Sequence, residues 1–173
     1  TSLYFFLDKF VHQKRISYFL KKNLKIKLFF DIGSHLGSYS DMIIKLYPEA
    51  NIFMFEPQNK IFDKIRLKYS ENLNVTVLNL ALSNKQGNQK IFIDKFDVAS
   101  TLSYRNLEDD LLLQRAKFFG EDPNEMIQSV QNIETIKLDD FINERKLHQI
   151  DLIKIDTEGH EFEVLDGLKK NID

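Results

Sequence analysis

A short glycine-containing turn between a predicted strand and a predicted helix constrains this fold more than any other feature of the sequence. The stretch Asp31-Ile-Gly-Ser-His-Leu-Gly37 follows an apolar run at 27–30 and precedes residues with helical periodicity. Because glycine has no Cβ, the main chain here can approach a ligand closely, and the first N–H groups of the helix point toward that ligand. Such a turn is typical of a nucleotide-type pocket in a βαβ unit, although ordinary tight turns also contain glycine pairs.

Apolar periodicity divides most of the chain into alternating strands and helices. The predicted strands cover 27–31, 51–55, 74–80, 89–94, 133–137 and 151–155. The predicted helices cover 3–22, 38–47, 59–71, much of 104–129, 138–146 and 161–170. This order predicts an α/β fold with a Rossmann-like, doubly wound and mostly parallel sheet covered on both faces. We expect a helical segment at 1–26 and one ligand-binding domain at 27–173, with the C-terminal strands of the sheet missing from the chain.

The composition is that of one globular domain and narrows the classes of function. The 173 residues are 43% hydrophobic and 29% charged, and a net charge of −2 does not predict a nucleic-acid surface. The absence of cysteine excludes disulfides, thiol catalysis and thiolate-bound metals. The 15 phenylalanines are interpreted as core residues. No apolar run is long enough to span a membrane and no signal peptide is recognisable, so a cytoplasmic location is expected.

Two segments carry charge patterns that the alternating fold does not require. Leucine, phenylalanine and tyrosine occupy one side of the predicted helix at 3–22, and Lys14, Arg15, Lys21 and Lys22 occupy the other. The favoured interpretation is packing against the sheet, and the alternative is a helix that lies on a membrane surface. The acidic, leucine-rich region at 104–129 is predicted to be either a lid over the substrate or a surface for a partner.

Glu56 ends the second predicted strand, 25 positions after Asp31. In βαβ nucleotide sites, an acid about 20 residues downstream accepts hydrogen bonds from ribose hydroxyls. The alternative is a solvated acid at a strand end. The chain lacks both the G-x-G-x-x-G spacing of NAD-binding folds and a P-loop motif. A carboxylate inside the turn instead suits a cationic ligand such as S-adenosylmethionine, which has a sulfonium and an ammonium group.

The stretch at 151–161 places an unusual density of charge on a strand and its C-terminal end. Lys154 interrupts an apolar run that is typical of a buried parallel strand, so it requires an acidic partner. Asp156, Glu158, His160 and Glu161 follow at the edge of the sheet where α/β folds bind ligands. This crowding favours an acid–base site. Helix capping by the last two residues and a metal site of the first three are the alternatives.

These motifs together resemble those of the FkbM-type family of S-adenosylmethionine-dependent methyltransferases. The resemblance extends over 28–170 and rests on five stretches in the same order: Asp31–Ser40, Phe55-Glu56-Pro57, Asn79–Ser83 with Gly87, Leu138-Asp139-Asp140, and Ile153–Glu161. It implies a class I methyltransferase fold and S-adenosylmethionine as the cofactor. Ser34 and His35 stand where the family usually has alanine and asparagine.

The resemblance also implies which residues contact the cofactor. They are Asp31, Gly33, Ser34, His35, Gly37, Ser40, Glu56, Asn79, Ala81 and Asp156. Within this set the glycine-containing turn would hold the methionine end and Glu56 the ribose. Asn79 and Ala81 would lie near the adenine, and Asp156 would lie beside the methyl donor.

The implied reaction is methylation of a hydroxyl on a sugar or secondary-metabolite acceptor. His160 is the first candidate for the base that takes the hydroxyl proton, followed by Glu158, and Lys154 would shape the site. Ser100 and Thr101 would approach the site from the loop before the acidic region. Two other classes stay open at this point: an NAD(P)-binding oxidoreductase and a non-catalytic interaction module with the same fold.

Overall fold

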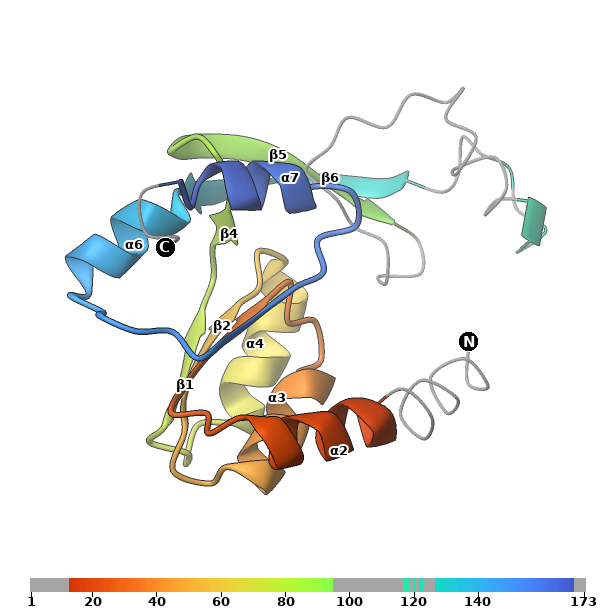
Figure 1. The fold of residues 1–173 in the computed structure, drawn as a ribbon. Helices are drawn as coiled ribbons and strands as arrows, with labels where there is room; N and C mark the ends of the chain where they lie inside the picture. The colour runs from red at the N-terminus through yellow and green to blue at the C-terminus, as the bar shows by residue number, and fades with distance from the viewer. Residues whose placement is uncertain (1–12, 95–116, 119, 121, 123–126, 170–173) are drawn as a thin grey trace.

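Four parallel strands form the central sheet of the protein, sheet A. The computed structural model describes residues 13–94, 117–118, 120, 122 and 127–169 (Figure 1). The strands of sheet A lie in the order β3 (Val75–Leu78), β2 (Asn51–Phe55), β1 (Leu28–Ile32) and β7 (Leu152–Ile155). Parallel neighbours need crossover connections, and the helices between the strands supply them. The predicted α/β class and parallel sheet are therefore confirmed.

Helices cover both faces of sheet A. On one face, α2 (Gln13–Asn23), α3 (Ser38–Leu46) and α4 (Asn59–Lys68) contribute to one apolar core. On the other face, α6 (Leu138–Glu144) and α7 (Glu161–Asp166) contribute to a second core. Successive side chains of a strand point to opposite faces, and accordingly Phe29 is buried in the first core and Phe30 in the second. This two-sided covering is the predicted doubly wound arrangement.

Phenylalanine fills much of the second core. The rings of Phe30, Phe53, Phe55 and Phe141 have centroids between 5.1 and 5.8 Å apart, mostly in edge-to-face pairs. Edge-to-face contacts are favourable because the positive ring edge meets the negative ring face. For these four residues the interpretation of phenylalanine as core is confirmed. It is wrong for Phe19, Phe118 and Phe162, whose side chains are exposed.

A second, three-stranded sheet, sheet B, was not predicted. It pairs β4 (Ala81–Leu82) in parallel with β6 (Ile127–Ile136), and β6 in antiparallel with β5 (Gly87–Asp94). Strand β6 is ten residues long, whereas the sequence predicted only 133–137. The first part of β6 is mostly exposed and polar, so it lacks the apolar alternation that identifies a half-buried strand.

Sheet B lies beyond the C-terminal end of strand β2. The side-chain amide of Gln131 in β6 donates to the carbonyl of Pro57 at 3.0 Å, directly after β2. Figure 1 shows sheet B, with α6 and α7 beside it, beyond one end of the strands of sheet A. The C-terminal edge of sheet A is therefore bordered by a second sheet.

Several predicted boundaries differ from the structure. Helix α4 ends at Lys68 rather than at residue 71, and α7 ends at Asp166 rather than at 170, where Gly167 follows. Residues 127–129, predicted as part of a helical region, belong to β6. Most of that region, together with Ser100 and Thr101, lies outside the described residues.

The basic N-terminal helix packs against sheet A, as the favoured interpretation predicted. Leu20 of α2 is buried in the first core with Phe29 and Met42, and Ile16 packs at its edge. The part of the predicted helix at 3–12 lies outside the described residues. Within the described part of the chain, no helix has the length and apolar character needed to cross a bilayer.

Candidate functional site

The turn after β1 packs so closely that only glycine fits at two positions. Gly33 and Gly37 have φ of 69° and 77°, in the left-handed region that side chains disfavour. A Cβ on Gly33 would overlap the main-chain oxygen of Asp156, and a Cβ on Gly37 would overlap the hydroxyl of Tyr69. The N–H groups of Gly33 and Ser34 donate to the carbonyl of Phe55, at 3.0 and 3.1 Å. The turn is thus fixed against the ends of both neighbouring strands.

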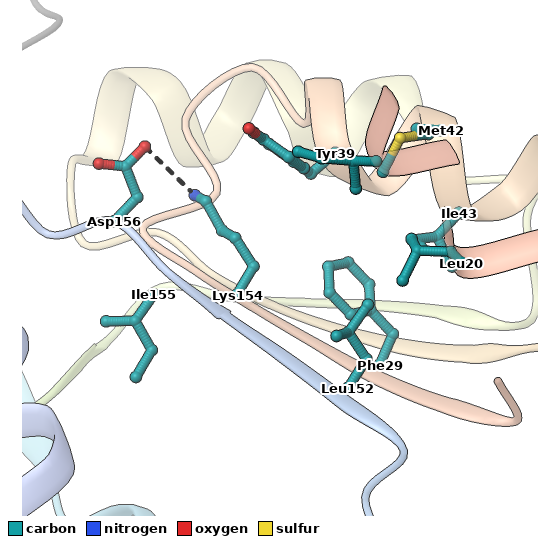
Figure 2. A pocket seen from close by; sticks show the side chains of 10 residues that line it. Leu20, Phe29, Tyr39, Met42, Ile43, Leu152, Lys154, Ile155 and Asp156 are labelled. Carbon is teal, nitrogen blue, oxygen red and sulfur yellow. Dashed lines mark ion pairs between the residues drawn. The ribbon is translucent and has the colours of Figure 1, made fainter. Parts of the chain in front are cut away.

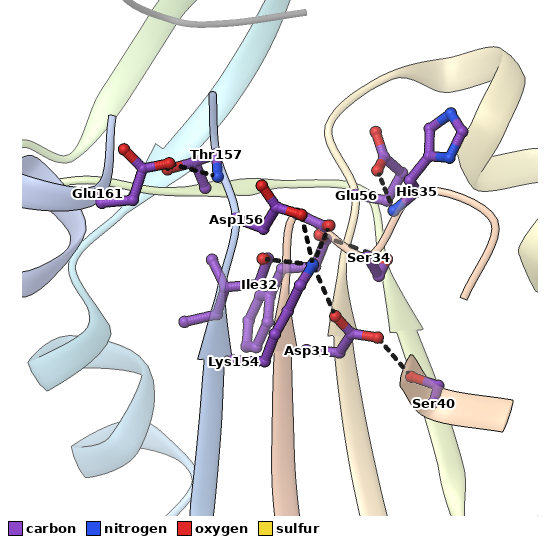
Figure 3. A network of polar contacts seen from close by, with 12 residues as sticks. Asp31, Ile32, Ser34, His35, Ser40, Glu56, Lys154, Asp156, Thr157 and Glu161 are labelled. Atoms are coloured by element: carbon purple, nitrogen blue, oxygen red, sulfur yellow. Dashed lines mark hydrogen bonds and ion pairs between the residues drawn. The ribbon is translucent and has the colours of Figure 1, made fainter. Parts of the chain in front are cut away.

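A buried ion pair lies directly beneath this turn. Asp31 is fully buried, and its Oδ1 lies 3.2 Å from Nζ of Lys154, which faces it in the β1–β7 register. The hydroxyl of Ser40 donates to Asp31 Oδ2 at 2.7 Å. Lys154 Nζ also donates to the carbonyl of Gly33 at 2.6 Å and lies 3.7 Å from Asp156 Oδ2 (Figure 3). The acidic partners that the sequence required for Lys154 are therefore Asp31 and Asp156.

Glu56 is a buried carboxyl rather than a solvated acid at a strand end. Its two oxygens accept the N–H groups of His35 at 2.8 Å and Gln58 at 2.9 Å. Burial raises the pKa of Glu56 to about 7, although these two hydrogen bonds and the charge of Lys154 counteract the rise. The amide of Asn79 donates to the carbonyl of Glu56 at 3.0 Å and so holds the loop that carries it.

Ionising Glu56 should destabilise the unliganded protein. The folded carboxyl keeps its proton to about pH 7, whereas the unfolded one releases it near 4.5. The native state therefore binds more protons in this window, and the free energy of unfolding should fall by about 3 kcal/mol as pH rises through it. Urea unfolding at pH 5 and pH 8 measures the difference, and Glu56→Gln should remove most of it. Equal pH dependence in the variant would contradict the assignment. His160 also contributes to the pH dependence. Because its pKa is lowered in the folded protein, its contribution raises the free energy of unfolding as pH rises toward 6.5, and this contribution is the same in the wild-type protein and in Glu56→Gln.

The loop after β7 turns Asp156 toward solvent. Glu161, the first residue of α7, reaches back and accepts the N–H groups of Thr157 at 2.8 Å and Gly159 at 3.1 Å. Glu158 has a φ of 53° and is exposed. The Asp156 side chain is 61% exposed, although its main chain lies against the glycine-containing turn. Of the predicted acids, Asp156 is thus the one that adjoins Lys154 from an accessible position.

His160 has a different environment from the one that the sequence suggested. It is buried, its Nε2 lies 3.0 Å from the hydroxyl oxygen of Ser83, and its Nδ1 lies 3.5 Å from Glu163. Burial lowers the pKa of His160, and the charges of Glu163 and Glu161 offset this only in part. These contacts join α7 to the residue after β4, so the structure groups His160 with Ser83 rather than with Lys154.

Two residues predicted to contact the cofactor, Ala81 and Ser34, pack within the protein. Ala81 lies in β4 and is buried with Ile91 and Ile133 of sheet B. Ser34 is buried, and its hydroxyl lies 3.5 Å from the carbonyl of Phe55.

Two residues after strand β2 hold the glycine-containing turn by hydrogen bonds that were not predicted from the sequence. The hydroxyl of Tyr69 lies 2.9 Å from the carbonyl of Gly37 and 2.8 Å from Oδ1 of Asp41. Lys68 donates to the carbonyl of Leu36 at 3.0 Å and to Asp41 at 2.7 Å. Apolar periodicity carries no signal for the partner of a tyrosine hydroxyl, so these contacts could not be predicted from the sequence.

A cavity of about 390 Å³ adjoins the ion pair on the α2 and α3 side of sheet A. Its walls are mainly apolar and include Leu20, Met42 and Leu152, while Lys154 and Asp156 lie at its polar end (Figure 2). The volume is in the range of small-molecule sites. Among the residues that the structure describes, no group of three or more potential ligand side chains could hold a metal ion.

Comparison with known proteins identifies the family. A model of the methyltransferase FkbM domain matches residues 31–173, which include the turn after β1 and the loop after β7. The chain belongs to the FkbM methyltransferase family. The resemblance seen in the sequence motifs is thereby confirmed.

Curated relatives of this FkbM chain are methyltransferases by name. The 2-O-methyltransferase NoeI of Sinorhizobium fredii is 27% identical over 165 residues, 94% of this chain and 64% of the relative. Methyltransferase sdnD of Sordaria araneosa is 28% identical, over 80% of this chain and 59% of the relative. The hexuronic acid methyltransferase AglP of Haloferax volcanii is 23% identical, over 80% of this chain and 48% of the relative. The chain thus spans about half to two thirds of their lengths.

The fold agrees with a solved FkbM structure. The crystal structure of methyltransferase FkbM from Methylobacillus flagellatus KT matches 90% of this chain and 33% of its own, with a TM-score of 0.54 and 17% sequence identity. At this identity the match supports the Rossmann-like fold and not a particular substrate.

Proposed function

We propose that this FkbM chain binds S-adenosylmethionine and transfers its methyl group to a hydroxyl of a sugar or secondary metabolite. One observation carries the proposal: two left-handed glycines lie over a buried Asp31–Lys154 pair, beside a buried Glu56 on the adjacent strand. Parallel α/β sheets bind nucleotide-like ligands at this edge.

The residues present fit the chemical groups of S-adenosylmethionine. The cofactor has adjacent ribose hydroxyls, an α-ammonium and an α-carboxylate. Glu56 offers carboxylate oxygens for the hydroxyls, and each oxygen has a further lone pair besides its main-chain hydrogen bond. Asp31 is already neutralised by Lys154, so the exposed Asp156 is the stronger candidate for the ammonium. Lys154 is the candidate for the carboxylate.

Family membership favours this function over that of an NAD(P)-binding oxidoreductase. The names of two relatives support the acceptor class, since NoeI is a 2-O-methyltransferase and AglP a hexuronic acid methyltransferase. The apolar cavity beside Lys154 and Asp156 offers space for part of a ligand next to the charged network. A small-molecule acceptor and a cytoplasmic location belong to the same proposal.

The chain's own residues would position the acceptor and remove its proton. When bound, S-adenosylmethionine supplies an electrophilic methyl group, and a water-poor site favours the loss of positive charge on transfer. Neutral imidazole can accept a proton, and the lowered pKa keeps His160 neutral at pH 7. His160 would have to exchange its contact with Ser83 for the acceptor, whereas the exposed Glu158 needs no such exchange.

Transfer of isotope-labelled methyl from S-adenosylmethionine to a panel of sugars and hydroxylated metabolites tests the proposal. If His160 is the base, His160→Ala should retain cofactor affinity and lower turnover about 100-fold or more. The exposed His148→Ala is the matched control and should retain turnover. Near wild-type turnover of His160→Ala in a folded protein would transfer the base assignment to Glu158. Failure of the wild-type protein to label any acceptor while binding the cofactor would contradict the acceptor class.

A further inference from the structure

The outer side of α2 combines exposed aromatic rings with a dense positive charge. Tyr18 and Phe19 are 71% and 59% exposed. Residues 13–27 contain six basic residues and no acidic residue, in a chain whose net charge is −2. The six basic residues, all exposed, are Lys14, Arg15, Lys21, Lys22, Lys25 and Lys27. We call the exposed side of α2, with Tyr18, Phe19 and the four cations that lie within the helix, Lys14, Arg15, Lys21 and Lys22, the α2 surface.

The helix period fixes how rings and cations are arranged on this surface. Residues three and four apart lie on one line of a helix. Lys14, Tyr18 and Lys21 therefore follow one line, and Arg15, Phe19 and Lys22 follow the adjacent line. Each aromatic ring has a cation about one turn before it and another about one turn after it.

Packing on the inner side holds this surface outward. Leu20 is buried in the first core, and Ile16 packs against the same core, so α2 cannot turn its rings inward without losing these contacts. In Figure 1, α2 lies at the periphery of the molecule beside α3, away from sheet B. Aromatic rings this exposed bury little apolar area within the described structure, so core packing does not explain them.

We propose that the α2 surface docks onto an anionic lipid bilayer. In interfacial helices, aromatic rings enter the boundary between headgroups and acyl chains, while lysine and arginine remain at the phosphates. Anionic lipid attracts each nearby cation, so the four cations of α2, a helix without an acidic residue, match such a surface in charge. The sequence of residues 1–12 is also rich in aromatic residues, with Tyr4, Phe5, Phe6 and Phe10, and contains one lysine and one acid. This docking is independent of the proposed methyl transfer.

A tryptophan probe can test the proposal directly, because the chain contains no tryptophan of its own. The full chain with Phe19→Trp is mixed with vesicles of phosphatidylcholine, with and without phosphatidylserine. We expect a blue-shifted emission, and quenching by brominated acyl chains, on the vesicles that contain phosphatidylserine. Binding to pure phosphatidylcholine should be at least about tenfold weaker, and added salt should weaken binding to the anionic vesicles.

Matched substitutions distinguish binding through the α2 surface from non-specific adsorption of the protein to vesicles. In vesicle sedimentation, Lys21→Glu with Lys22→Glu should weaken binding at least about tenfold, and Tyr18→Ser with Phe19→Ser should also weaken it. Lys60→Glu with Lys64→Glu makes the same change of charge on the exposed side of α4 and should have little effect. Leu67→Ser with Leu73→Ser removes two other exposed apolar side chains, 77% and 97% exposed, and is the apolar control.

Three results would overturn the proposal. The first is a tryptophan emission from the Phe19→Trp protein that is neither shifted nor quenched on any vesicle type. The second is equal weakening by the α4 charge control and the α2 charge variant. The third is tight binding to duplex DNA or RNA that depends on Lys21 and Lys22 but not on Tyr18 and Phe19, without any quenching by brominated lipid. That last result would assign the surface to nucleic acid instead.

Discussion

Replacing Lys154 with methionine is expected to lower the free energy of unfolding by about 3–5 kcal/mol. The reason is that the carboxylate of Asp31, which is fully buried, would lose the ammonium 3.2 Å away and become a buried charge without its counter-ion. The carbonyl of Gly33 would lose a hydrogen bond as well. Urea unfolding followed by circular dichroism measures the change, and binding of S-adenosylmethionine to whatever remains folded should be lost.

The double variant Asp31→Asn with Lys154→Met is the internal control for this prediction. With both charges removed, no isolated charge stays buried, so the double variant should regain much of the stability lost in Lys154→Met. Lys60→Met on the exposed side of α4 should change stability by less than about 0.5 kcal/mol. A loss below about 1 kcal/mol for Lys154→Met, or strictly additive effects in the double variant, would show that the pair is not coupled as the structure indicates.

Gly33→Ala is expected to be the most damaging single change in the glycine-containing turn. The new Cβ would overlap the main-chain oxygen of Asp156, which cannot move away as a flexible side chain can. The positive φ of 69° adds strain of about 1–2 kcal/mol for a residue with a Cβ. Together with the cost of overpacking, about 1–3 kcal/mol, the stability loss should be about 3 kcal/mol or more, measured by the same unfolding assay.

Gly120→Ala separates the overlap from the backbone strain. Gly120 has the same φ of 69°, but none of the residues that the structure describes lies within 4 Å of its added Cβ. The Gly120→Ala variant should therefore lose only about 1–2 kcal/mol of unfolding free energy, which is the cost of the backbone strain, and cofactor binding should stay intact. Equal losses at the two glycines would mean that the turn does not pack against the chain after β7.

The parts of the fold that follow from the sequence are those with continuous local signals. Strands β1 and β2 are mostly apolar runs with an acid near the C-terminal end, Asp31 inside β1 and Glu56 directly after β2. The helix after each strand has apolar residues spaced for one face, so these parts of sheet A could be predicted. Lys154 stood out because it interrupts such a run, and its need for an acid was predictable from burial alone. Which acid it meets depends on the β1–β7 register, which places it opposite Asp31.

The parts that could not be predicted depend on contacts between distant residues. Sheet B has a polar, exposed strand, β6, whose extended form depends on pairing with β5 and carries little apolar periodicity. His160 lies against Ser83, 77 positions earlier, so its environment could not be read from the charged stretch around it. Tyr69 likewise meets Gly37 across 32 positions. Residue type and spacing predicted that Asp31, Glu56 and Asp156 lie toward the C-terminal ends of neighbouring strands, as they do in sheet A, but tertiary packing decided which other side chains gather near them.

Calorimetric titration of the wild-type protein with S-adenosylmethionine, and with NAD as the comparison ligand, measures whether the chain binds the methyl donor. We expect binding of S-adenosylmethionine in the micromolar range, lost in Gly33→Ala and retained in Gly120→Ala, with no heat from NAD. A folded protein that binds NAD, or that gives no heat with S-adenosylmethionine, would contradict the claim that the turn over Asp31 and Lys154 is the methyl-donor site.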